Sequence, residues 1–378
     1  MIELAEVFRR FAADYLAAHG ASMLPSHRRA IEDILACRTA ALGGQVWRCQ
    51  VWRCERCEAE VFSYHSCRNR GCPKCHTAQT QEWLERRQAE MLPVPHFHVT
   101  VTAPAELREV LRTNQRDGYA ALMRASAGAI IELARDPRHV GGTVAVLAVL
   151  HTWTQQLSFH PHVHCLVSGG GISEDGTTWH PARRTFLLPI KALARLVRGK
   201  FRALLRQKCP DLVVPDAVWR KPWILHVTAW GRGEQAVLDY LARYVFRIAL
   251  TNARITGLDE QTVSLQHRDR KTGRLRTCRL SGGEFMRRFL QHVLPRGLHK
   301  VRYCGLWHPA QRHNAGQIRH TLQLQAPPKL DPPQDPTTPA PAPNAEPVLS
   351  GGPSICPHCH QGRLIVVRRL TPQQAMGP

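Results

Sequence analysis

The chain has 378 residues, 43% of them hydrophobic, which is enough for one large domain with appendages or for two domains. Lys and Arg number 51 against 29 Asp and Glu, a formal net charge of +22 that indicates a polyanionic partner, usually nucleic acid. No apolar run reaches the roughly 18 residues of a membrane-spanning helix, and the charged, amphipathic N-terminus is unlike a signal peptide. We therefore expect a cytoplasmic, nucleoid-associated protein of bacterial type that has no membrane contact.

Helical spacing of apolar residues predicts two N-terminal helices, over residues 2–19 and roughly 26–36, and a cysteine-rich segment follows them. The 13 cysteines of the chain lie in short-range groups and do not spread as a disulfide framework, which favours metal binding. Cys54-x-x-Cys57 and Cys72-x-x-Cys75 each direct two thiolates at one point. We expect these two knuckles to complete one tetrahedral zinc shell.

A five-residue unit is repeated in tandem here, because VWRCQ at 46–50 is followed directly by VWRCE at 51–55. Either Cys49 or Cys54 could be the zinc ligand, and Cys54 is preferred because it keeps the two-residue gap to Cys57. The cysteines left over could build a second site. The predicted zinc ligands are Cys37, Cys54, Cys57, Cys67, Cys72 and Cys75.

The rest of the chain alternates strands and helices. Strands are expected over 96–104, 143–153, 160–167, 222–230, 262–269 and 274–281, and helices over about 77–91, 105–136, 188–208, 233–255 and 282–295. The strands at 143–153 and 160–167 are close enough in sequence to form an antiparallel hairpin.

A Pro-rich stretch, residues 326–349, indicates a disordered linker near the C-terminus. The tail beyond it carries Cys356-Pro-His-Cys359, which is half of a zinc knuckle. Its partners could be His358, His360 or a second chain.

The stretch HPHVHCLV at 160–167 reads as a strand in which His162 and His164 point to the same face. Two imidazoles on one rigid strand can hold one divalent metal ion. An open metal site needs a third ligand, for which Gln155 is preferred over Gln156 and His160.

Tyr240 and Tyr244 lie one turn apart on one face of the helix expected at 233–255, a spacing that core packing also produces. A tyrosine hydroxyl, with a reference pKa of about 10, is a poor nucleophile at neutral pH. It becomes useful when a cation, here at His162 and His164, polarises the phosphodiester that it attacks. The product would be a covalent phosphotyrosine.

Basic side chains accompany both groups of candidate residues. A zinc module that carries many cations predicts a surface for DNA phosphates. The candidate DNA-binding residues are Arg68, Arg70 and Lys74 in the cysteine-rich segment, and Arg243 and Arg247 beside the tyrosines.

Five segments carry a family resemblance: CRTAALGG (37–44), YHSCRNRGCPKC (64–75), LPVPHFHVTVTAP (92–104), HPHVH (160–164) and YLARYVFR (240–247). In these residues and in their order, the chain resembles the rolling-circle transposases of the insertion sequence 91 family, which are members of the HUH endonuclease superfamily. The resemblance spans about residues 20–325. It implies Mg or Mn at His162 and His164, and Tyr240 and Tyr244 as nucleophiles. It also implies single-stranded DNA, at the element's ends and target, as the substrate.

The fold that the resemblance implies is α+β, with a central antiparallel sheet flanked by helices and the metal on one face of the sheet. The expected domains are N-terminal helices with a zinc-binding module (1–92), a catalytic domain (93–325), a Pro-rich linker (326–352) and a short CxxC tail (353–378).

Four readings of the function follow, and the weakest is a metallohydrolase that uses His162 and His164 and would not need the tyrosines. The leading one is a two-tyrosine DNA transposase. A plasmid or phage rolling-circle replication initiator, or a relaxase, would share the metal and the tyrosines, but the N-terminal cysteine module favours the transposase. A zinc-dependent nucleic-acid-binding regulator without catalysis explains the charge and the cysteines, and leaves the paired histidines and tyrosines unexplained.

Overall fold

The computed structural model describes residues 1–50, 57, 59–75, 91–232, 240, 244–245, 248–269, 272–324, 355–360 and 362–372. Most of the helices expected at 77–91 and 233–255, and nearly all of the expected linker, lie outside these residues. The helices are α1 (Leu4–His19), α2 (Pro25–Ala36), α4 (Arg108–Thr113), α5 (Gln115–Ala134), α6 (Ile190–Lys208), α7 (Asp216–Arg220), α9 (Gly282–Leu290) and α10 (Arg312–Leu324). The strands are β1 (Gly44–Gln50), β2 (Glu60–Tyr64), β3 (Pro95–Thr102), β4 (Thr143–Trp153), β5 (Phe159–Ile172), β6 (Trp179–Pro181), β7 (Ile224–Arg232), β8 (Ile255–Leu258), β9 (Thr262–Arg268), β10 (Leu275–Ser281), β11 (Val301–Gly305) and β12 (Arg363–Leu370).

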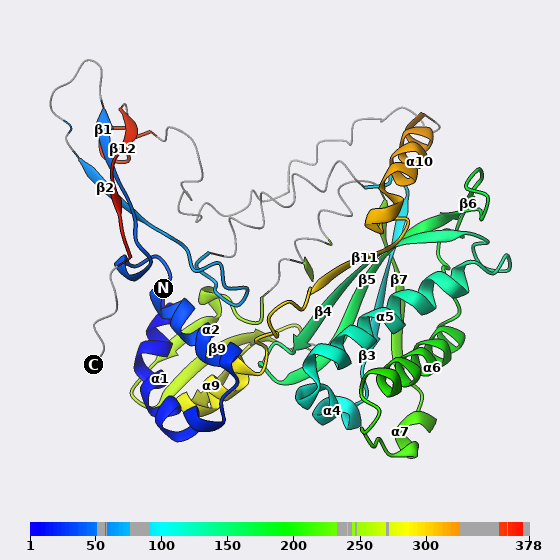
Figure 1. Ribbon diagram of the computed structural model, residues 1–378, viewed down its shortest axis with the longest axis horizontal. Coiled ribbons are helices and arrows are strands. Elements are labelled where there is room, and N and C mark those ends of the chain that lie inside the picture. Colours follow the sequence, from blue (N-terminus) through cyan, green and yellow to red (C-terminus); the bar gives the residue numbers. More distant parts are fainter. Residues whose placement is uncertain are drawn as a thin grey trace.

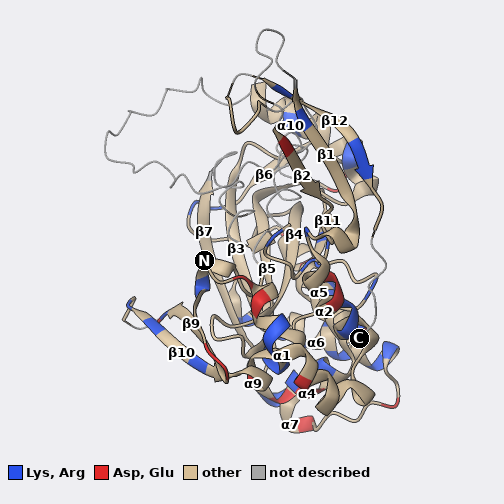
Figure 2. Ribbon diagram, turned by 90° about the vertical axis from the view of Figure 1, so that its left-hand side faces the viewer, with Lys and Arg blue, Asp and Glu red and all other residues tan. Residues whose placement is uncertain are grey.

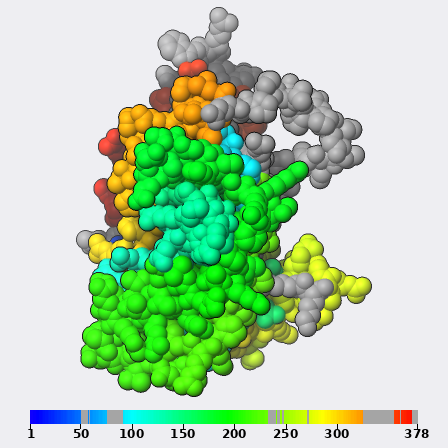
Figure 3. Space-filling view, turned by 90° about the vertical axis from the view of Figure 1, so that its right-hand side faces the viewer, coloured from blue at the N-terminus to red at the C-terminus, as the bar shows by residue number. Residues whose placement is uncertain are grey.

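A central sheet in the order β11-β4-β5-β3-β7 organises the molecule, with β6 paired to the end of β5 (Figure 1). Every pairing within it is antiparallel. Helices α4 to α7 lie together along one side of the sheet in Figure 1. The green part of the chain, to which α6 and α7 belong, forms most of the surface in Figure 3. The expected α+β fold with a central antiparallel sheet flanked by helices is therefore confirmed.

The two faces of the sheet differ because side chains alternate along a strand. On β5, Val163, Cys165 and Val167 join the apolar core that α5 and α6 cover. The intervening His162 and His164 point to the opposite face, where Leu166 packs with Tyr240. This second face is the one that carries the polar side chains of interest.

A second core joins the two ends of the folded chain. Phe8 and Phe11 of α1 pack there with Phe285 and Phe289 of α9, and with apolar residues of β9 and β10. The ring centroids of Phe8 and Phe289 are 5.3 Å apart in an edge-to-face arrangement. This core thus crosses the domain boundary expected at residue 92. The hairpin of β9 and β10, with Arg276 and Arg279 on β10, projects from this part of the molecule (Figure 2).

A small sheet in the order β12-β1-β2 lies apart from the central one (Figure 1). Its outer strand β12 comes from the C-terminal tail, which pairs with β1 from Gly44↔Leu370 to Gln50↔Arg363. The tail expected as a separate appendage is therefore a strand of the N-terminal module.

Close packing of α1 on α9 predicts that a methyl group at Gly282 is not tolerated. A Cβ placed there would lie 2.1 Å from Cδ1 of Phe11, whereas a Cβ at the neighbouring Gly283 meets nothing within 4 Å. We expect Gly282→Ala to lower stability by about 1–3 kcal/mol through overpacking. Thermal unfolding followed by circular dichroism measures this loss. Gly283→Ala is the matched control, and equal melting temperatures for the two variants would contradict the prediction.

Candidate active site

Three histidines meet on the face of the central sheet opposite α5 and α6: His151 from β4, and His162 and His164 from β5. All three are buried, and they offer ring nitrogens that lie within 4.8 Å of one another. His151 stands directly opposite His162 in the antiparallel register of the two strands. Residues opposite each other in such a pair share a face, so the third imidazole is supplied by the neighbouring strand.

Backbone carbonyls set the tautomers of two of these histidines. Nδ1 of His162 donates to the carbonyl of His160 at 2.6 Å, and Nε2 of His151 donates to the carbonyl of Tyr244 at 2.7 Å. The proton then sits on the bonded nitrogen, and the other nitrogen of each ring carries the lone pair that a metal ion requires.

The charge state of the cluster also fits a metal site. Burial lowers the pKa of His151 well below its ordinary value, and the nearby Lys300 ammonium adds to this effect. Metal ions bind the neutral imidazole, so an environment that keeps the ring neutral favours binding. Three histidine ligands suit a divalent cation with open positions.

The three residues considered for the third ligand, Gln155, Gln156 and His160, have other partners in the structure. Oε1 of Gln155 accepts a hydrogen bond from the backbone N–H of Arg268 at 2.8 Å. The side-chain amide of Gln156 lies 3.0 Å from Nε2 of His267, and Nδ1 of His160 lies 3.2 Å from Nη2 of Arg108. The two glutamines sit in the turn between β4 and β5, past the end of the paired strands, and so cannot share the face of His162 and His164.

Two side chains from β3, those of His98 and Thr100, contact His164 of the cluster, and the sequence alone did not indicate this. Nε2 of His98 lies 2.9 Å from Nδ1 of His164, and Oγ1 of Thr100 lies within 3.3 Å of both nitrogens. The alternation in HFHVT placed these residues on one face, but only the pairing of β3 with β5 brings that face to His164.

Tyr244 packs directly on the histidine cluster, whereas Tyr240 lies behind it. The ring centroid of Tyr244 is 4.2 Å from that of His164 and 4.9 Å from that of Tyr240. Tyr240 is fully buried. Burial raises the pKa of Tyr240 well above its ordinary value. The two tyrosines are therefore adjacent but not equivalent.

Cysteines gather in two separate groups of four, and the grouping differs from the expected one. Cys37, Cys67, Cys72 and Cys75 form the first group, and Cys49, Cys57, Cys356 and Cys359 form the second. The two knuckles expected to share one zinc shell therefore lie apart, and Cys54 lies outside the described residues. The reason is that the core formed by α1, α2 and α9 holds Cys37, Cys72 and Cys75, whereas Cys57 belongs to the hairpin of β1 and β2.

The first group fits a structural zinc ion. Zinc–sulfur bonds of about 2.3 Å in a tetrahedron place the sulfurs roughly 3.8 Å apart. Sγ of Cys67 lies 3.7 Å from Sγ of Cys75, and the backbone N–H of Asn69 donates to Cys67 at 3.4 Å. All four are free cysteines.

A cleft of about 420 Å³ connects the first cysteine group with the end of β4. Arg68 and Arg70 of the knuckle line it together with Arg29, Arg296 and Lys300, and Asp33 is the one acidic residue among the described lining residues. Aromatic residues that line it include Trp153, whose ring centroid lies 4.5 Å from that of His151. The cleft is therefore positively charged and adjoins the histidine cluster.

Lys74 is not among the described residues that line this cleft. Nζ of Lys74 lies 2.8 Å from a carboxylate oxygen of Glu3, and only 21% of its side chain is exposed. This ion pair ties the knuckle to the start of α1, so a structural role suits Lys74 better than contact with DNA. Arg243 and Arg247 lie outside the described residues.

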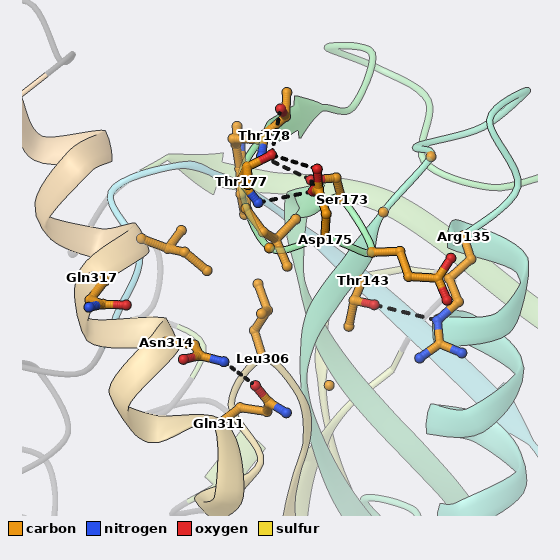
Figure 4. A pocket seen from close by; sticks show the side chains of 18 of the residues that line it. Arg135, Thr143, Ser173, Asp175, Thr177, Thr178, Leu306, Gln311, Asn314 and Gln317 are labelled. Atoms are coloured by element: carbon orange, nitrogen blue, oxygen red, sulfur yellow. Dashed lines mark hydrogen bonds between the residues drawn. The ribbon is translucent and has the colours of Figure 1, made fainter.

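A larger cleft of about 1380 Å³ lies at the opposite end of β4, between the loop at 173–178 and α10 (Figure 4). Its described lining includes Glu174, Asp175 and one arginine, Arg135. The carboxylate of Asp175 already accepts hydrogen bonds from Thr177 and Ser173. The acidic side chains of this cleft disfavour a phosphate ligand. The histidine cluster is therefore the better candidate for phosphodiester chemistry.

Comparisons with known proteins match two segments of the chain, one that contains the histidine cluster and one that contains the first cysteine group. A family model described as "Putative transposase" matches residues 145–315, and one described as "Transposase zinc-binding domain" matches residues 7–103. "Putative transposase y4qJ" of Sinorhizobium fredii is 36% identical over 387 residues, which cover 97% of this chain and 94% of that protein. The chain belongs to the insertion sequence 91 family of transposases.

A second relative, "Transposase for insertion sequence element IS801" of Pseudomonas savastanoi pv. phaseolicola, is 26% identical over 296 residues, 73% of this chain and 68% of that protein. No solved structure matches the chain. The segment matched at 145–315 contains the three histidines of the cluster and the paired Tyr240 and Tyr244. Within its described residues, none of the helices has the length and apolar character needed to cross a membrane.

Loss of the third imidazole tests the metal site directly. We expect His151→Ala to weaken Mn²⁺ binding at least about 10-fold, because one of three ligands is removed. Isothermal titration of the full chain with Mn²⁺ measures the affinity, and circular dichroism checks the fold. Gln155→Ala is the control and should bind as the unmodified protein does. The reverse order of the two variants would return the ligand role to Gln155.

Proposed function

We propose that this transposase cleaves and rejoins single-stranded DNA through covalent 5′-phosphotyrosine intermediates during rolling-circle transposition. The observation that carries the proposal is the ring of Tyr244, 4.2 Å between centroids from His164 of the three-histidine cluster. A potential nucleophile and a potential metal site thus share one face of one rigid sheet. Family membership supplies the setting, because transposases act on DNA.

In the proposed reaction, His151, His162 and His164 would hold Mg or Mn. The cation, when bound, would polarise the phosphodiester and offset the charge that develops on it. The hydroxyl oxygen of Tyr244 forms a bond to phosphorus, and the bond from phosphorus to the 3′ oxygen of the preceding nucleotide breaks. The tyrosine gives up its proton and the 3′ oxygen leaves as a hydroxyl. Attack of a 3′ hydroxyl on the phosphotyrosine reverses these steps and rejoins DNA without an external energy source.

The structure supports an order for the two tyrosines in this proposal. Tyr244 acts first, since its ring contacts His164 and His98. The hydroxyl of Tyr240 is buried and its pKa is raised, so it becomes a nucleophile only after its segment moves. Two tyrosines allow one to hold a cleaved strand while the other attacks a second strand.

Single-stranded DNA fits the cleft that adjoins the cluster. Five cationic side chains supply the charge that follows a phosphate backbone, and Trp153 supplies a ring on which a base can stack. Nζ of Lys300 lies 5.2 Å from the ring centroid of Trp153, which adds charge beside that stacking surface. A regulator without catalysis would use such a cleft, but it would not need the histidine cluster beside it.

A covalent-trapping experiment tests the nucleophile. A single-stranded oligonucleotide that carries the end of the encoding element is incubated with the full chain and Mn²⁺, and adducts are resolved by denaturing gel and mass spectrometry. We expect Tyr244→Phe to lower the initial rate of adduct formation at least 100-fold, while Tyr240→Phe retains an adduct on Tyr244.

The matched pair of phenylalanine variants makes the outcome decisive. Both keep the aromatic packing and lose one hydroxyl, and oligonucleotide binding without metal should remain unchanged in both. An adduct that persists at the original rate in the double variant Tyr240→Phe/Tyr244→Phe would exclude these two tyrosines as the nucleophile. An adduct that depends on Tyr240 alone would reverse the proposed order.

Substitution of Arg68 tests whether single-stranded DNA binds in the cleft. Its side chain is exposed and lines the cleft, so Arg68→Ala should weaken binding of a single-stranded oligonucleotide and reduce the slope of log K against log salt by roughly 0.7. Fluorescence anisotropy at several salt concentrations measures both quantities. Arg138→Ala is the control, because its side chain is 84% exposed and it precedes the far end of β4. Equal losses in the two variants would indicate net charge rather than a DNA path through the cleft.

A further inference from the structure

The second cysteine group is assembled from the two ends of the chain. Cys49 lies on β1 and Cys57 follows it in the same hairpin, whereas Cys356 and Cys359 precede β12 in the tail. Sγ of Cys49 lies 3.6 Å from Sγ of Cys359, and Sγ of Cys57 lies 3.9 Å from Sγ of Cys356. Each of the two short sulfur contacts therefore joins one N-terminal cysteine to one cysteine of the tail.

These distances match a metal shell and exclude disulfide geometry. Sulfurs around a tetrahedral zinc ion lie roughly 3.8 Å apart, whereas the two sulfurs of a disulfide lie about 2.05 Å apart. The first cysteine group, which falls within the matched zinc-binding domain, shows the same spacing with 3.7 Å between Cys67 and Cys75.

The backbone around the tail cysteines repeats a feature of the first group. Arg68 follows Cys67 with a φ of 54°, and His360 follows Cys359 with a φ of 55°. In each case the next turn of backbone directs an N–H at the sulfur, from Asn69 to Cys67 at 3.4 Å and from Gly362 to Cys359 at 3.3 Å. Left-handed backbone is uncommon outside glycine, so two instances beside cysteine sulfurs indicate the same ligand knuckle.

Among the described residues, the small sheet has few buried apolar side chains: Val46 of β1 is buried, and a small core lies around the cysteine group. That core consists of Cys49, Cys356 and Leu364, against which Trp47 and Val61 pack in part. Ile365, Val366 and Val367 of β12 are each about 40% exposed. A sheet of three short strands with so small a core needs a further staple, and a structural metal is a common one.

We propose that Cys49, Cys57, Cys356 and Cys359 bind a second structural zinc ion, which fastens the C-terminal tail to the N-terminal hairpin. The matched zinc-binding domain ends at residue 103, so it does not include the tail that supplies half of this site. The site needs no second chain, and it does not depend on the chemistry proposed for the histidine cluster.

Two alternatives from the sequence lose support in this arrangement. His358 and His360 are exposed and do not belong to the group, so the tail knuckle uses cysteine ligands from β1 and its hairpin. The tandem repeat offers Cys49 and Cys54 in the same VWRC context, and Cys49 is the one whose sulfur completes the shell of four.

Zinc content of the purified full chain tests the site, with the tandem repeat as an internal control. Elemental analysis should find two zinc ions per chain, one for each cysteine group. Cys49→Ser and the double variant Cys356→Ser/Cys359→Ser should each retain one. Cys54→Ser, which changes the same residue type in the same local sequence, should retain two.

A cleavage experiment tests the fastening without any change to a ligand. A protease site is inserted into the Pro-rich segment at 326–349, the full chain is cut, and the products are separated by size-exclusion chromatography. The tail fragment should remain with the body and be released by a strong zinc chelator. The proposal would be overturned by two zinc ions in the tail variant or by loss of zinc from Cys54→Ser alone. It would also be overturned by a tail fragment that separates before chelation, or by an intact mass that reports a disulfide.

Discussion

The register between β4 and β5 is the constraint on which the site depends. It sets His151 opposite His162, and alternation along β5 then puts His164 on the same face. A slip of one residue would turn His151 toward the apolar core beneath α5 and α6, because side chains alternate between faces. The hydrophobic pattern of β4 prevents that slip, since Val144, Val146, Ala148 and Leu150 all belong to the core on the other face.

The same sheet thus has two faces with separate tasks. The face under the helices is apolar and closely packed, which holds the strands rigid. The other face carries the imidazoles, the tyrosines and Trp230, whose ring centroid lies 5.6 Å from that of Tyr244, beside apolar residues such as Leu147 and Leu166. His151 links the two parts of the proposed chemistry, because one of its ring nitrogens is available to the metal site while the other is bonded to the carbonyl of Tyr244. A single side chain therefore positions both the metal site and the backbone of the proposed nucleophile.

The two cysteine groups connect segments that lie far apart in the chain. The first group packs in the core that joins α1 and α2 to α9, and Trp153 of the central sheet packs against the same core, so the knuckle that carries Arg68 is held beside that sheet. The cleft between them is a consequence of this attachment. The second group brings the tail back to β1, and the N-terminal module is complete only when both ends of the chain are present.

Much of the fold and about half of the candidate site could be predicted from the sequence, because they follow from short-range periodicity. Alternation in HPHVHCLV was enough to place His162 and His164 on one face, and the hairpin with 143–153 followed from proximity along the chain. The tertiary structure alone decided which residues complete each site. His151 needed the strand register, and the partners of Cys49 lie about 300 residues away, at Cys356 and Cys359. Local sequence determines where a side chain points, whereas its ligand partners depend on long-range contacts that local patterns do not encode.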